Sequence, residues 1–459
     1  MKKIILSFGL FLSLMACSEK TSIDYALLTG KIENIDTKVI TINKEGQPLK
    51  KEIVVKPDGT FIDTIKTKPG FYLVNVGRNK ALVYLDAGNK INLTVDNKDF
   101  YGSLKFSGEG SEITNYVKFK NKKIAELKGK SAEFYALEEV EFKKKVKNIR
   151  ETLSNVIDTI KGIKPEFKAL EKKGFDYNYL LDLSKYASGY HKARVNNPNY
   201  KASKEFLAEF DTLNLNNEVE FKRSSLYKQL VVNYYVNEIR DLSEKDSIDF
   251  MVAKVKVHSK IPNEYIKNEL LFSGAEYAMI KIENFEEYYQ TFISASTNES
   301  NNAKITAVYN KLSKLNRGQV SPKFFNYENN AGGTLSLDDL KGKYTYIDLW
   351  ATWCAPCLAQ VPFLKKIEKA YHGKNINFLS ISIDNPKDHD KWKKMIADKD
   401  LGGIQVIADK STKSQFAQEY FITSIPRFIL IDPNGLIIDK KAPLPSNPEL
   451  IELFNELNI

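Results

Sequence analysis

The pattern of hydrophobic and polar residues changes twice along the chain and divides it into three regions after a short leader. From residue 26 to residue 109, short runs rich in β-branched residues are separated by turn residues, which is typical of β-strands. Strands are expected over residues 27–32, 39–42, 53–55, 61–65, 71–76, 81–85 and 91–95. We therefore predict an antiparallel β-sandwich-like domain over residues 26–109, with a partial barrel as the alternative, and its sequence offers no catalytic constellation.

From residue 110 to residue 317 the hydrophobic residues recur every three or four positions, which predicts a helical region. Residues 142–160 show this spacing, and residues 221–239 and 265–292 repeat it with many aromatic side chains. Helix breaks are expected at the prolines Pro165, Pro198 and Pro262. The region is expected to separate the C-terminal region from its tether or to recognise partners.

In residues 318–459, strand-like runs alternate with helical segments and a hairpin comes near the end, which predicts an α/β fold. Strands are expected over residues 344–350, 376–383, 404–407, 428–431 and 436–438. Helices are expected over residues 354–371, 387–397, 414–419 and 449–457.

Two cysteines, Cys354 and Cys357, directly follow the apolar run of residues 344–350 and stand where a helix pattern begins. Such a pair can close or open a disulfide on one helical turn. The unpaired N–H groups and the positive dipole end of a helix start favour a thiolate over a thiol. We therefore expect Cys354 to be the nucleophile.

The segment Trp353-Cys354-Ala355-Pro356-Cys357 after a buried strand resembles the active site of thioredoxin-fold oxidoreductases. With Leu-Trp-Ala-Thr in front of it, residues 318–459 are most similar to the TlpA/ResA-like thiol-disulfide oxidoreductases of bacterial envelopes. The resemblance implies a thioredoxin-like fold with an inserted strand and helix. It also implies an enzyme that exchanges disulfides with partner proteins, with Pro356 supporting the active site.

Three further positions agree with this resemblance. Asp348 matches the buried acid that takes and returns the proton of the resolving thiol; a charge exposed at the strand end is the alternative. Pro362 matches the proline that bends the active-site helix. Ile425-Pro426 matches the cis-proline loop that faces the cysteines and binds substrate backbone, although an ordinary proline at a strand entry has the same sequence.

Three further residues bear on partner approach or on proton handling at the site. Trp353 is expected to shield the cysteine pair and to offer an apolar contact surface, with plain core packing as the alternative. Gln360 stands where many TlpA/ResA-like proteins carry a glutamate, so Asp348 remains the expected proton-handling group. Arg427 follows the expected cis-proline, where a small hydroxylated residue is common in the family.

The first residues read as a processing signal rather than as structure. Residues 1–16 contain two lysines followed by an apolar run that is too short to span a membrane, which indicates a secretion signal. Residues 14–17, Leu-Met-Ala-Cys, resemble a bacterial lipobox, which implies lipidation of Cys17 and a tether over residues 17–25. A conventional signal-peptidase site is the alternative. The expected location is the cell envelope, lipid-anchored and facing the periplasm or the exterior.

The charge distribution and the number of cysteines exclude further classes of function. The formal charge of +10 comes from lysines spread along all 459 residues, and the clustered basic residues of a nucleic-acid-binding protein are missing. One of the three cysteines is assigned to the lipid, so the other two are expected to be redox-active rather than structural. No cofactor is expected besides this pair.

Other chemistries of a cysteine pair fit less well. Zinc binding would require more ligands, and His372 and His389 do not stand at ligand spacing, so no metal is expected. Haem attachment requires a histidine after the second cysteine, where Leu358 stands. A peroxiredoxin-type peroxidase places its cysteine differently, so peroxide reduction is expected at most as a side activity.

The resemblance implies the partners. Electrons would come from a membrane thiol reductase, and the substrates would be envelope protein thiols and disulfides, with apocytochrome c as one candidate. The reducing direction is expected. Two alternatives remain: a disulfide oxidase or isomerase that uses the same cysteines, and a binding or scaffold lipoprotein with a redox switch.

Overall fold

The computed structural model describes residues 23–44, 51–66 and 68–459. The predicted secretion signal and the predicted lipidation site Cys17 lie outside the described residues. The chain forms two compact units, of which the first is Met1–Leu215 with Val219–Tyr234 and the second is Asn216–Glu218 with Tyr235–Ile459.

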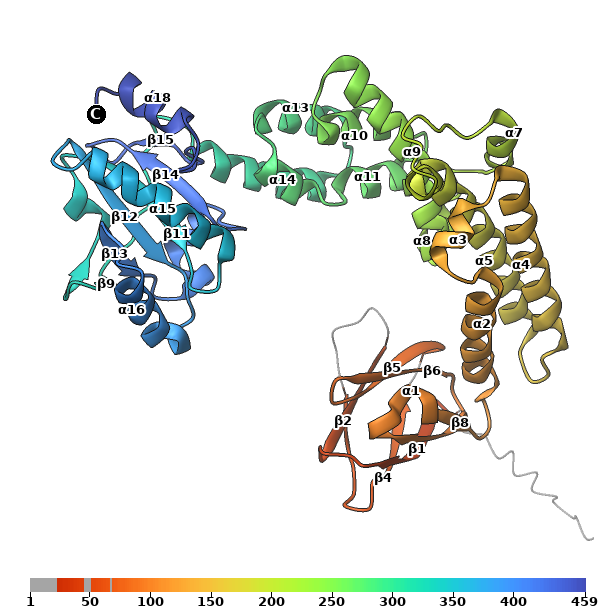
Figure 1. The fold of residues 1–459 in the computed structure, drawn as a ribbon. Helices are drawn as coiled ribbons and strands as arrows, with labels where there is room; N and C mark the ends of the chain where they lie inside the picture. The colour runs from red at the N-terminus through yellow and green to blue at the C-terminus, as the bar shows by residue number, and fades with distance from the viewer. Residues whose placement is uncertain (1–22, 45–50, 67) are drawn as a thin grey trace, which may run out of the picture. The chain divides into compact units, whose positions relative to one another are not determined.

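The first unit begins with a sandwich of two four-stranded sheets, coloured red and orange in Figure 1. Their strand orders are β4-β1-β7-β8 and β3-β2-β5-β6. The strands are β1(Tyr25–Glu33), β2(Val39–Lys44), β3(Lys51–Val54), β4(Thr60–Lys66), β5(Gly70–Val76), β6(Asn79–Leu85), β7(Lys90–Asp96) and β8(Lys105–Ser107). Alternate side chains of both sheets, such as Leu28 and Val74, are buried in one shared core, because successive strand residues point to opposite faces.

One pairing in this sandwich differs from the antiparallel arrangement that the sequence predicts. β1 and β7 are parallel, with Leu28 opposite Ile91, while the other pairings described in these two sheets are antiparallel. Five strands separate β1 from β7 along the chain, which provides the long crossover that parallel neighbours need. Turn residues indicate local hairpins and carry no information about which distant strands meet.

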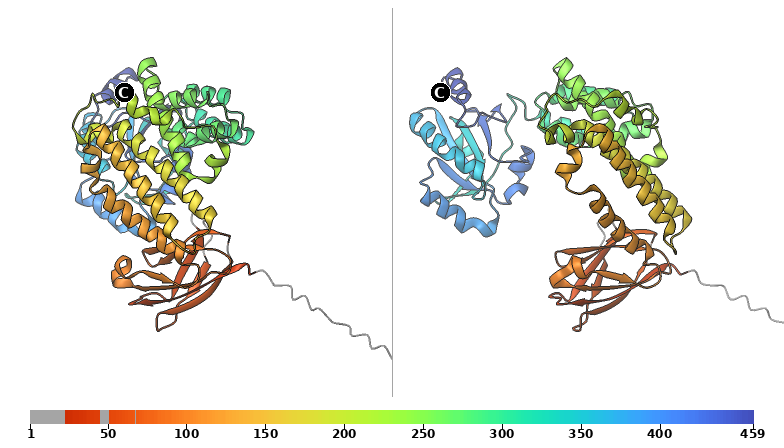
Figure 2. Two further views of the ribbon diagram at one scale, coloured as in Figure 1. Left: turned by 90° about the vertical axis from the view of Figure 1, so that its right-hand side faces the viewer. Right: turned by 45° about the vertical axis from the view of Figure 1, so that its right-hand side comes forward.

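Helices follow the sandwich and continue into the second unit. They are α1(Phe100–Ser103), α2(Glu112–Lys128), α3(Ser131–Ala136), α4(Glu139–Thr159), α5(Pro165–Lys185), α6(His191–Arg194), α7(Lys204–Leu207), α8(Glu218–Arg223), α9(Ser225–Asp246), α10(Phe250–His258), α11(Glu264–Phe272), α12(Ala275–Lys281), α13(Phe285–Ala295) and α14(Glu299–Ser313). The long helices α4 and α5 lie side by side, as Figure 2 shows. The breaks expected at the three prolines are confirmed, since Pro165 begins α5 and the other two lie between helices. Within the described part of the chain, no helix has the length and apolar character needed to cross a membrane.

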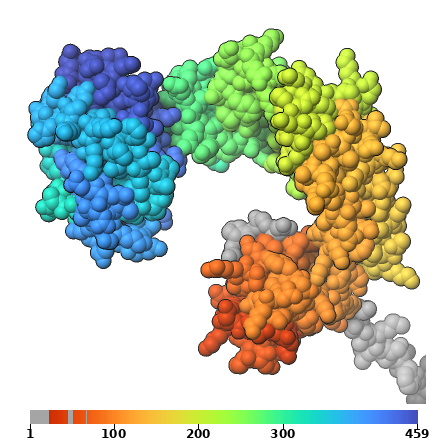
Figure 3. Space-filling model, viewed as in Figure 1, coloured from red at the N-terminus to blue at the C-terminus, as the bar shows by residue number. Residues whose placement is uncertain are grey.

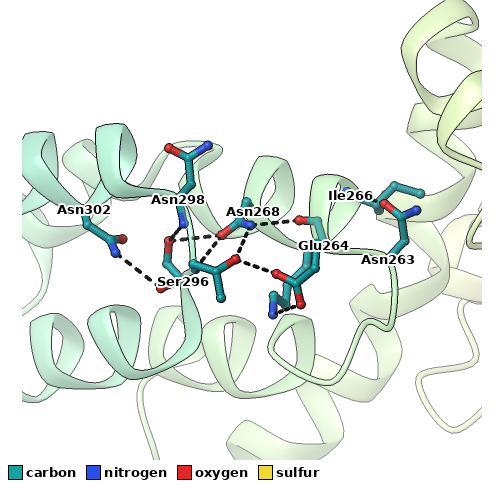
Figure 4. A network of polar contacts seen from close by, with 9 residues as sticks. Asn263, Glu264, Ile266, Asn268, Ser296, Asn298 and Asn302 are labelled. Atoms are coloured by element: carbon teal, nitrogen blue, oxygen red, sulfur yellow. Dashed lines mark hydrogen bonds and ion pairs between the residues drawn. The ribbon is translucent and has the colours of Figure 1, made fainter.

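A polar network joins α11 to the turn between α13 and α14 (Figure 4). Asn268 accepts hydrogen bonds from Ser296 Oγ at 3.1 Å and from the backbone N of Thr297 at 3.0 Å. Asn263 caps α11 and Asn298 caps α14, each by accepting a hydrogen bond from a backbone N–H in the first turn. Because these groups satisfy one another, the network fixes the helix junction and has a structural role.

Residues 318–459, called the C-terminal region below, contain a seven-stranded sheet in the order β10-β9-β13-β12-β11-β14-β15. Its strands are β9(Tyr327–Asn329), β10(Thr334–Leu335), β11(Tyr344–Trp350), β12(Ile376–Ser382), β13(Ile404–Ile407), β14(Arg427–Ile431) and β15(Ile437–Asp439). Its helices are α15(Ala355–Ala370), α16(His389–Asp398), α17(Gln415–Glu419) and α18(Glu449–Glu456). β11, β12 and β13 are mutually parallel, and the outer strands are antiparallel to their neighbours.

Helices cover both faces of this sheet (Figure 1), and Figure 3 shows the surface atoms of this region in teal to blue. On one face, α15 and α18 pack against Tyr346 and Phe428 through Ile367 and Phe454. On the other face, Trp392 of α16 is completely buried against the strands. The predicted fold class is confirmed: a β domain, a helical middle and a C-terminal α/β fold. The short β9–β10 hairpin was not predicted.

Candidate functional site

The central strand β11 ends four residues before Cys354, which lies at the start of α15. β11 pairs with β12 on one side and with β14 on the other, and Ile347 and Leu349 are fully buried. Cys354 is the N-cap residue of α15, and its Sγ accepts a hydrogen bond from the backbone N of Cys357 at 3.2 Å. Pro356 occupies the first turn, where a missing N–H does not interrupt the helix.

The two sulfur atoms form a disulfide, and both cysteines are 4% exposed. The predicted pairing is therefore confirmed. Because the Sγ of Cys354 already faces an N–H group of the helix start, a thiolate formed there on reduction would be stabilised by that group and by the helix dipole.

A buried aspartate that sequence reasoning missed holds the loop between β11 and α15. Asp384 is 0% exposed and accepts hydrogen bonds from the backbone N of Thr352 at 2.9 Å and from its Oγ1 at 2.8 Å. Ser382 Oγ donates to the same carboxylate at 2.7 Å. These bonds fix the backbone one residue before Trp353 and so help to position the cysteines.

Asp348 lies on β11 and lines a cavity of about 20 Å³ together with Cys357. Although part of the residue remains accessible, its Oδ1 atom is shut off from solvent and has no hydrogen-bond partner among the described residues. Burial raises the pKa of Asp348 to about 8, and the charge of Glu368 adds to this effect. The expected environment of a buried acid near the resolving cysteine is therefore present, and the exposed strand-end alternative is wrong.

The structure also locates the predicted partner-binding residues. Trp353 is 61% exposed, which is inconsistent with plain core packing. The Ile425–Pro426 peptide bond is cis, as predicted, and both residues are partly exposed. Pro362 lies inside α15, where its missing N–H interrupts the helical hydrogen bonds.

The two departures from the family pattern have separate structural settings. Gln360 accepts a hydrogen bond from the backbone N of Ser446 at 3.1 Å, and it does not line the cavity that contains Cys357. Arg427 is half-buried at the start of β14, and burial lowers its pKa against the opposing effect of Asp439.

Glu368 and Gln405 complete the cavity, and the sequence analysis did not identify them. Burial raises the pKa of Glu368 to about 7, while Lys365 works in the opposite direction. Gln405 Oε1 is buried without a hydrogen-bond partner in the described structure. A signal for Glu368 was available, because it continues the helical spacing of the cavity-lining residues Cys357, Val361 and Leu364 along α15.

The arrangement suits thiol chemistry. It combines a disulfide at a helix start, a partly buried carboxyl that can hold a proton at neutral pH, and an exposed aromatic side chain beside the pair. In the described ranges, no group of three or more histidine, cysteine, aspartate or glutamate side chains is arranged to hold a metal ion.

Comparison with known proteins gives matches in this part of the chain. Residues 318–440 match the model of the AhpC/TSA family. The thiol-disulfide oxidoreductase ResA of Bacillus cereus is 28% identical over 127 residues, which cover 28% of this chain and 70% of the relative. ResA of Bacillus subtilis is 25% identical over 134 residues, which cover 29% of this chain and 70% of the relative.

Solved structures give similar matches. The solution structure of a candidate thiol-disulfide oxidoreductase from Bacteroides vulgatus is 46% identical, with 29% of this chain and 86% of that chain covered and a TM-score of 0.27. The structure of a thiol-disulfide oxidoreductase from Bacteroides fragilis is 29% identical, with 30% of this chain and 99% of that chain covered and a TM-score of 0.28.

Proposed function

The C-terminal region is that of a ResA/TlpA-like thiol-disulfide oxidoreductase of the thioredoxin superfamily, and on this premise we propose that it reduces protein disulfides in the bacterial cell envelope. The observation that carries the proposal is the Cys354–Cys357 disulfide at the start of α15, beside the carboxyl of Asp348. No cofactor other than this cysteine pair is needed for the reaction.

In the first step, the thiolate of Cys354 attacks one sulfur of a partner disulfide. A bond forms between Cys354 Sγ and that sulfur, the partner's S–S bond breaks, and the other partner sulfur leaves as a thiolate. Trp353, Ile425 and Pro426 are the proposed contacts for the partner chain, since all three are at least partly accessible and the family resemblance assigns them to the surface beside the pair.

In the second step, the thiol of Cys357 gives its proton to Asp348 and becomes a thiolate. This thiolate attacks Cys354 Sγ, forms the internal disulfide and releases the second partner sulfur as a thiolate. Two electrons have then passed from the cysteine pair to the partner. A pKa of about 8 means that Asp348 is mainly protonated at pH 7 in the disulfide form, so it is ready to return a proton to Cys357 when new electrons arrive.

We further propose that a membrane thiol reductase supplies these electrons and that the substrates are envelope proteins, with apocytochrome c as one candidate. Lipidation at Cys17 would hold the protein at a membrane on the periplasmic or exterior side. These proposals rest on the lipobox-like residues and on the resemblance to the ResA/TlpA group.

The reduction potential of the cysteine pair tests the direction. We expect a value near about −270 mV in a series of thiol buffers, as for a reductase, whereas a value near about −120 mV would make the protein an oxidase. Failure of Cys354 and Cys357 to form the internal disulfide in solution would contradict the exchange mechanism altogether.

A further inference from the structure

We propose that Glu368 works with Asp348 as a carboxyl pair that carries the proton of Cys357 between the closed cavity and solvent. This inference rests on the proposed disulfide exchange and adds a residue to it. Glu368 does not touch the sulfur atoms in this scheme, so it is a positioning residue that controls the proton of Asp348.

A row of polar side chains on the sheet leads away from the resolving cysteine. Asp348 on β11 lies opposite Ser380 on β12, and Ser380 lies opposite Gln405 on β13. Side chains in register on neighbouring strands point to the same face of a sheet. All three line the same cavity as Cys357, so the polar row lies beneath α15.

Glu368 enters this cavity from α15. Cys357, Val361, Leu364 and Glu368 follow each other at helical spacing, and all four line the cavity. A charged residue on the face of a helix that packs on a sheet is costly unless it has a partner or a function. In the ion pairs of the described residues, the nearby Lys365 bonds to Asp400 at 3.3 Å rather than to Glu368.

Two glycines make room for the Glu368 carboxylate. A Cβ atom at Gly402 would lie 2.5 Å from Glu368 Oε2, and one at Gly403 would lie 2.9 Å from Glu368 Oε1. Gly403 also has a φ of +63°, a conformation that side chains rarely adopt. The segment before β13 therefore fits the carboxylate closely, and a larger residue at either position would displace it.

The cavity also contains polar atoms without partners. Among the described residues, Asp348 Oδ1, Gln405 Oε1 and Trp350 Nε1 are buried and make no hydrogen bond. The volume of about 20 Å³ is about the room that one water molecule needs. A proton held by either carboxyl, or a water molecule in the cavity, would satisfy these atoms and connect the two carboxyl groups.

The proton balance of the pair is simple. During the second exchange step, Cys357 Sγ–H loses its proton to the carboxylate of Asp348, and the thiolate forms the internal disulfide. At pH 7 Asp348 keeps this proton in the disulfide form, and as the pH rises through its pKa of about 8 it passes the proton to the carboxylate of Glu368, which releases it to solvent. When the disulfide is reduced again, one proton returns by the same route to Cys357 Sγ.

Several charged groups face the pair. Lys365 of α15 also lines the cavity that holds Asp348 and Glu368. Its charge lowers the pKa of Glu368, but the effect of burial is larger and raises it. Lys365 itself forms an ion pair with Asp400. Tyr346 on β11 interacts electrostatically with Asp348. Changes at Glu368 and at Lys365 should therefore move the titration of the pair in opposite directions.

The test uses the reduced full-length protein and one equivalent of an aromatic disulfide reagent, 5,5′-dithiobis(2-nitrobenzoate). The first released aromatic thiolate reports the attack by Cys354, and the second reports the attack by Cys357 on the mixed disulfide. The rates of both phases are followed by stopped-flow absorbance from pH 5 to pH 9.

For Glu368→Gln we expect an unchanged first phase and a limiting rate of the second phase that falls about tenfold. The midpoint of its pH profile should fall by about 0.5 to 1 pH unit, because the negative neighbour that raises the pKa of Asp348 is lost. For Lys365→Met the midpoint should rise, since a positive neighbour of Glu368 is lost. Lys366→Met on the exposed side of the same helix is the matched control and should leave the midpoint unchanged.

Wild-type midpoints in both Glu368→Gln and Lys365→Met would overturn the inference, as would an equal shift in Lys366→Met. The Lys365→Met arm keeps the test decisive if Glu368→Gln does not fold. Absence of both phases in the wild-type protein would instead overturn the exchange function itself, so the two failures are distinguishable.

Discussion

Two aspartates, the buried Asp182 in the first unit and the partly buried Asp348 in the second, illustrate how differently a fold can treat the same side chain. Asp182 on α5 is 6% exposed and accepts hydrogen bonds from Lys128 Nζ at 2.8 Å and from Tyr135 Oη at 3.3 Å. Asp348 on β11 remains partly accessible, but its Oδ1 atom is closed to solvent and makes no hydrogen bond in the described structure. Burial alone therefore does not mark a functional group. A buried carboxyl without a partner beside a reactive cysteine does.

The contrast between Asp182 and Asp348 depends first on whether the cysteine pair beside Asp348 exchanges disulfides. Cys354→Ser should reduce disulfide exchange with a model protein disulfide at least about a thousandfold, because the attacking thiolate is lost. Cys357→Ser should keep the first attack and accumulate a mixed disulfide that mass spectrometry can detect. If Cys354→Ser retained wild-type turnover, Asp348 would lie beside an inert pair and the contrast would lose its meaning.

Removal of each carboxylate should then separate the two aspartates kinetically. Asp348→Asn should slow the second exchange phase about a hundredfold, because the proton acceptor for Cys357 is lost. Asp182→Asn should leave both phases unchanged, since the bonds described for Asp182 come from Lys128 and Tyr135 of the first unit. Stopped-flow rates of the two variants measure this, and equal slowing in both would show that Asp348 is merely structural.

The same two variants should have opposite effects on stability. The pKa of Asp348 is raised from its ordinary 3.8 to about 8, so between these pH values the folded state binds more protons than the unfolded state. The free energy of unfolding contributed by this group thus falls as the pH rises from about 4 to about 8. Asp348→Asn should stabilise the second unit by about 2 to 4 kcal/mol at pH 8 and by much less at pH 4.

Asp182→Asn should destabilise the first unit by about 1 to 3 kcal/mol, because Lys128 and Tyr135 lose a charged partner. Native-state hydrogen exchange at several pH values reports the two units separately. Destabilisation in both variants would contradict the proposed difference between the two carboxyl groups.

The smallest expected effect concerns partner binding. Trp353→Ala should raise the KM for a protein disulfide about fivefold, because an exposed aromatic contact beside the cysteines is lost. Tyr277→Ala is the matched control, since Tyr277 on α12 is 62% exposed and belongs to the helical part of the chain. An unchanged KM in Trp353→Ala would remove this residue from the proposed contact surface.

Local patterns in the sequence predicted most elements of the fold. The strand over residues 344–350 was located to the residue, because a continuous apolar run is typical of a buried parallel strand. The predicted helix over residues 221–239 is interrupted in the structure, where α8 ends at Arg223 and α9 begins at Ser225. The parallel pairing of β1 with β7 and the β9–β10 hairpin were also missed, since very short strands and distant pairings leave little periodicity.

The candidate site also contains residues that the local sequence predicts and residues that only the fold brings together. Cys354 and Cys357 follow from their short spacing at one helix start, and Asp348 follows from the resemblance to thioredoxin-fold oxidoreductases, so their proximity could be predicted. Asp384 and Gln405 reach the site from distant segments, and nothing local distinguishes them from surface residues. Glu368 could have been noticed from its place on the inner face of α15, but only the structure shows that Gly402 and Gly403 make room for its carboxylate.

The sequence by itself determined which residues can exchange electrons, because the cysteine spacing and the helix start after an apolar strand are local features of the chain. The family resemblance of the sequence pointed to Asp348 as the acceptor of the accompanying proton, but only the tertiary structure decided which groups surround that proton. Proton transfer depends on burial, on missing hydrogen-bond partners and on the closeness of two carboxyl groups from β11 and α15. These quantities arise when the sheet packs against the helix, and no linear pattern of residues contains them.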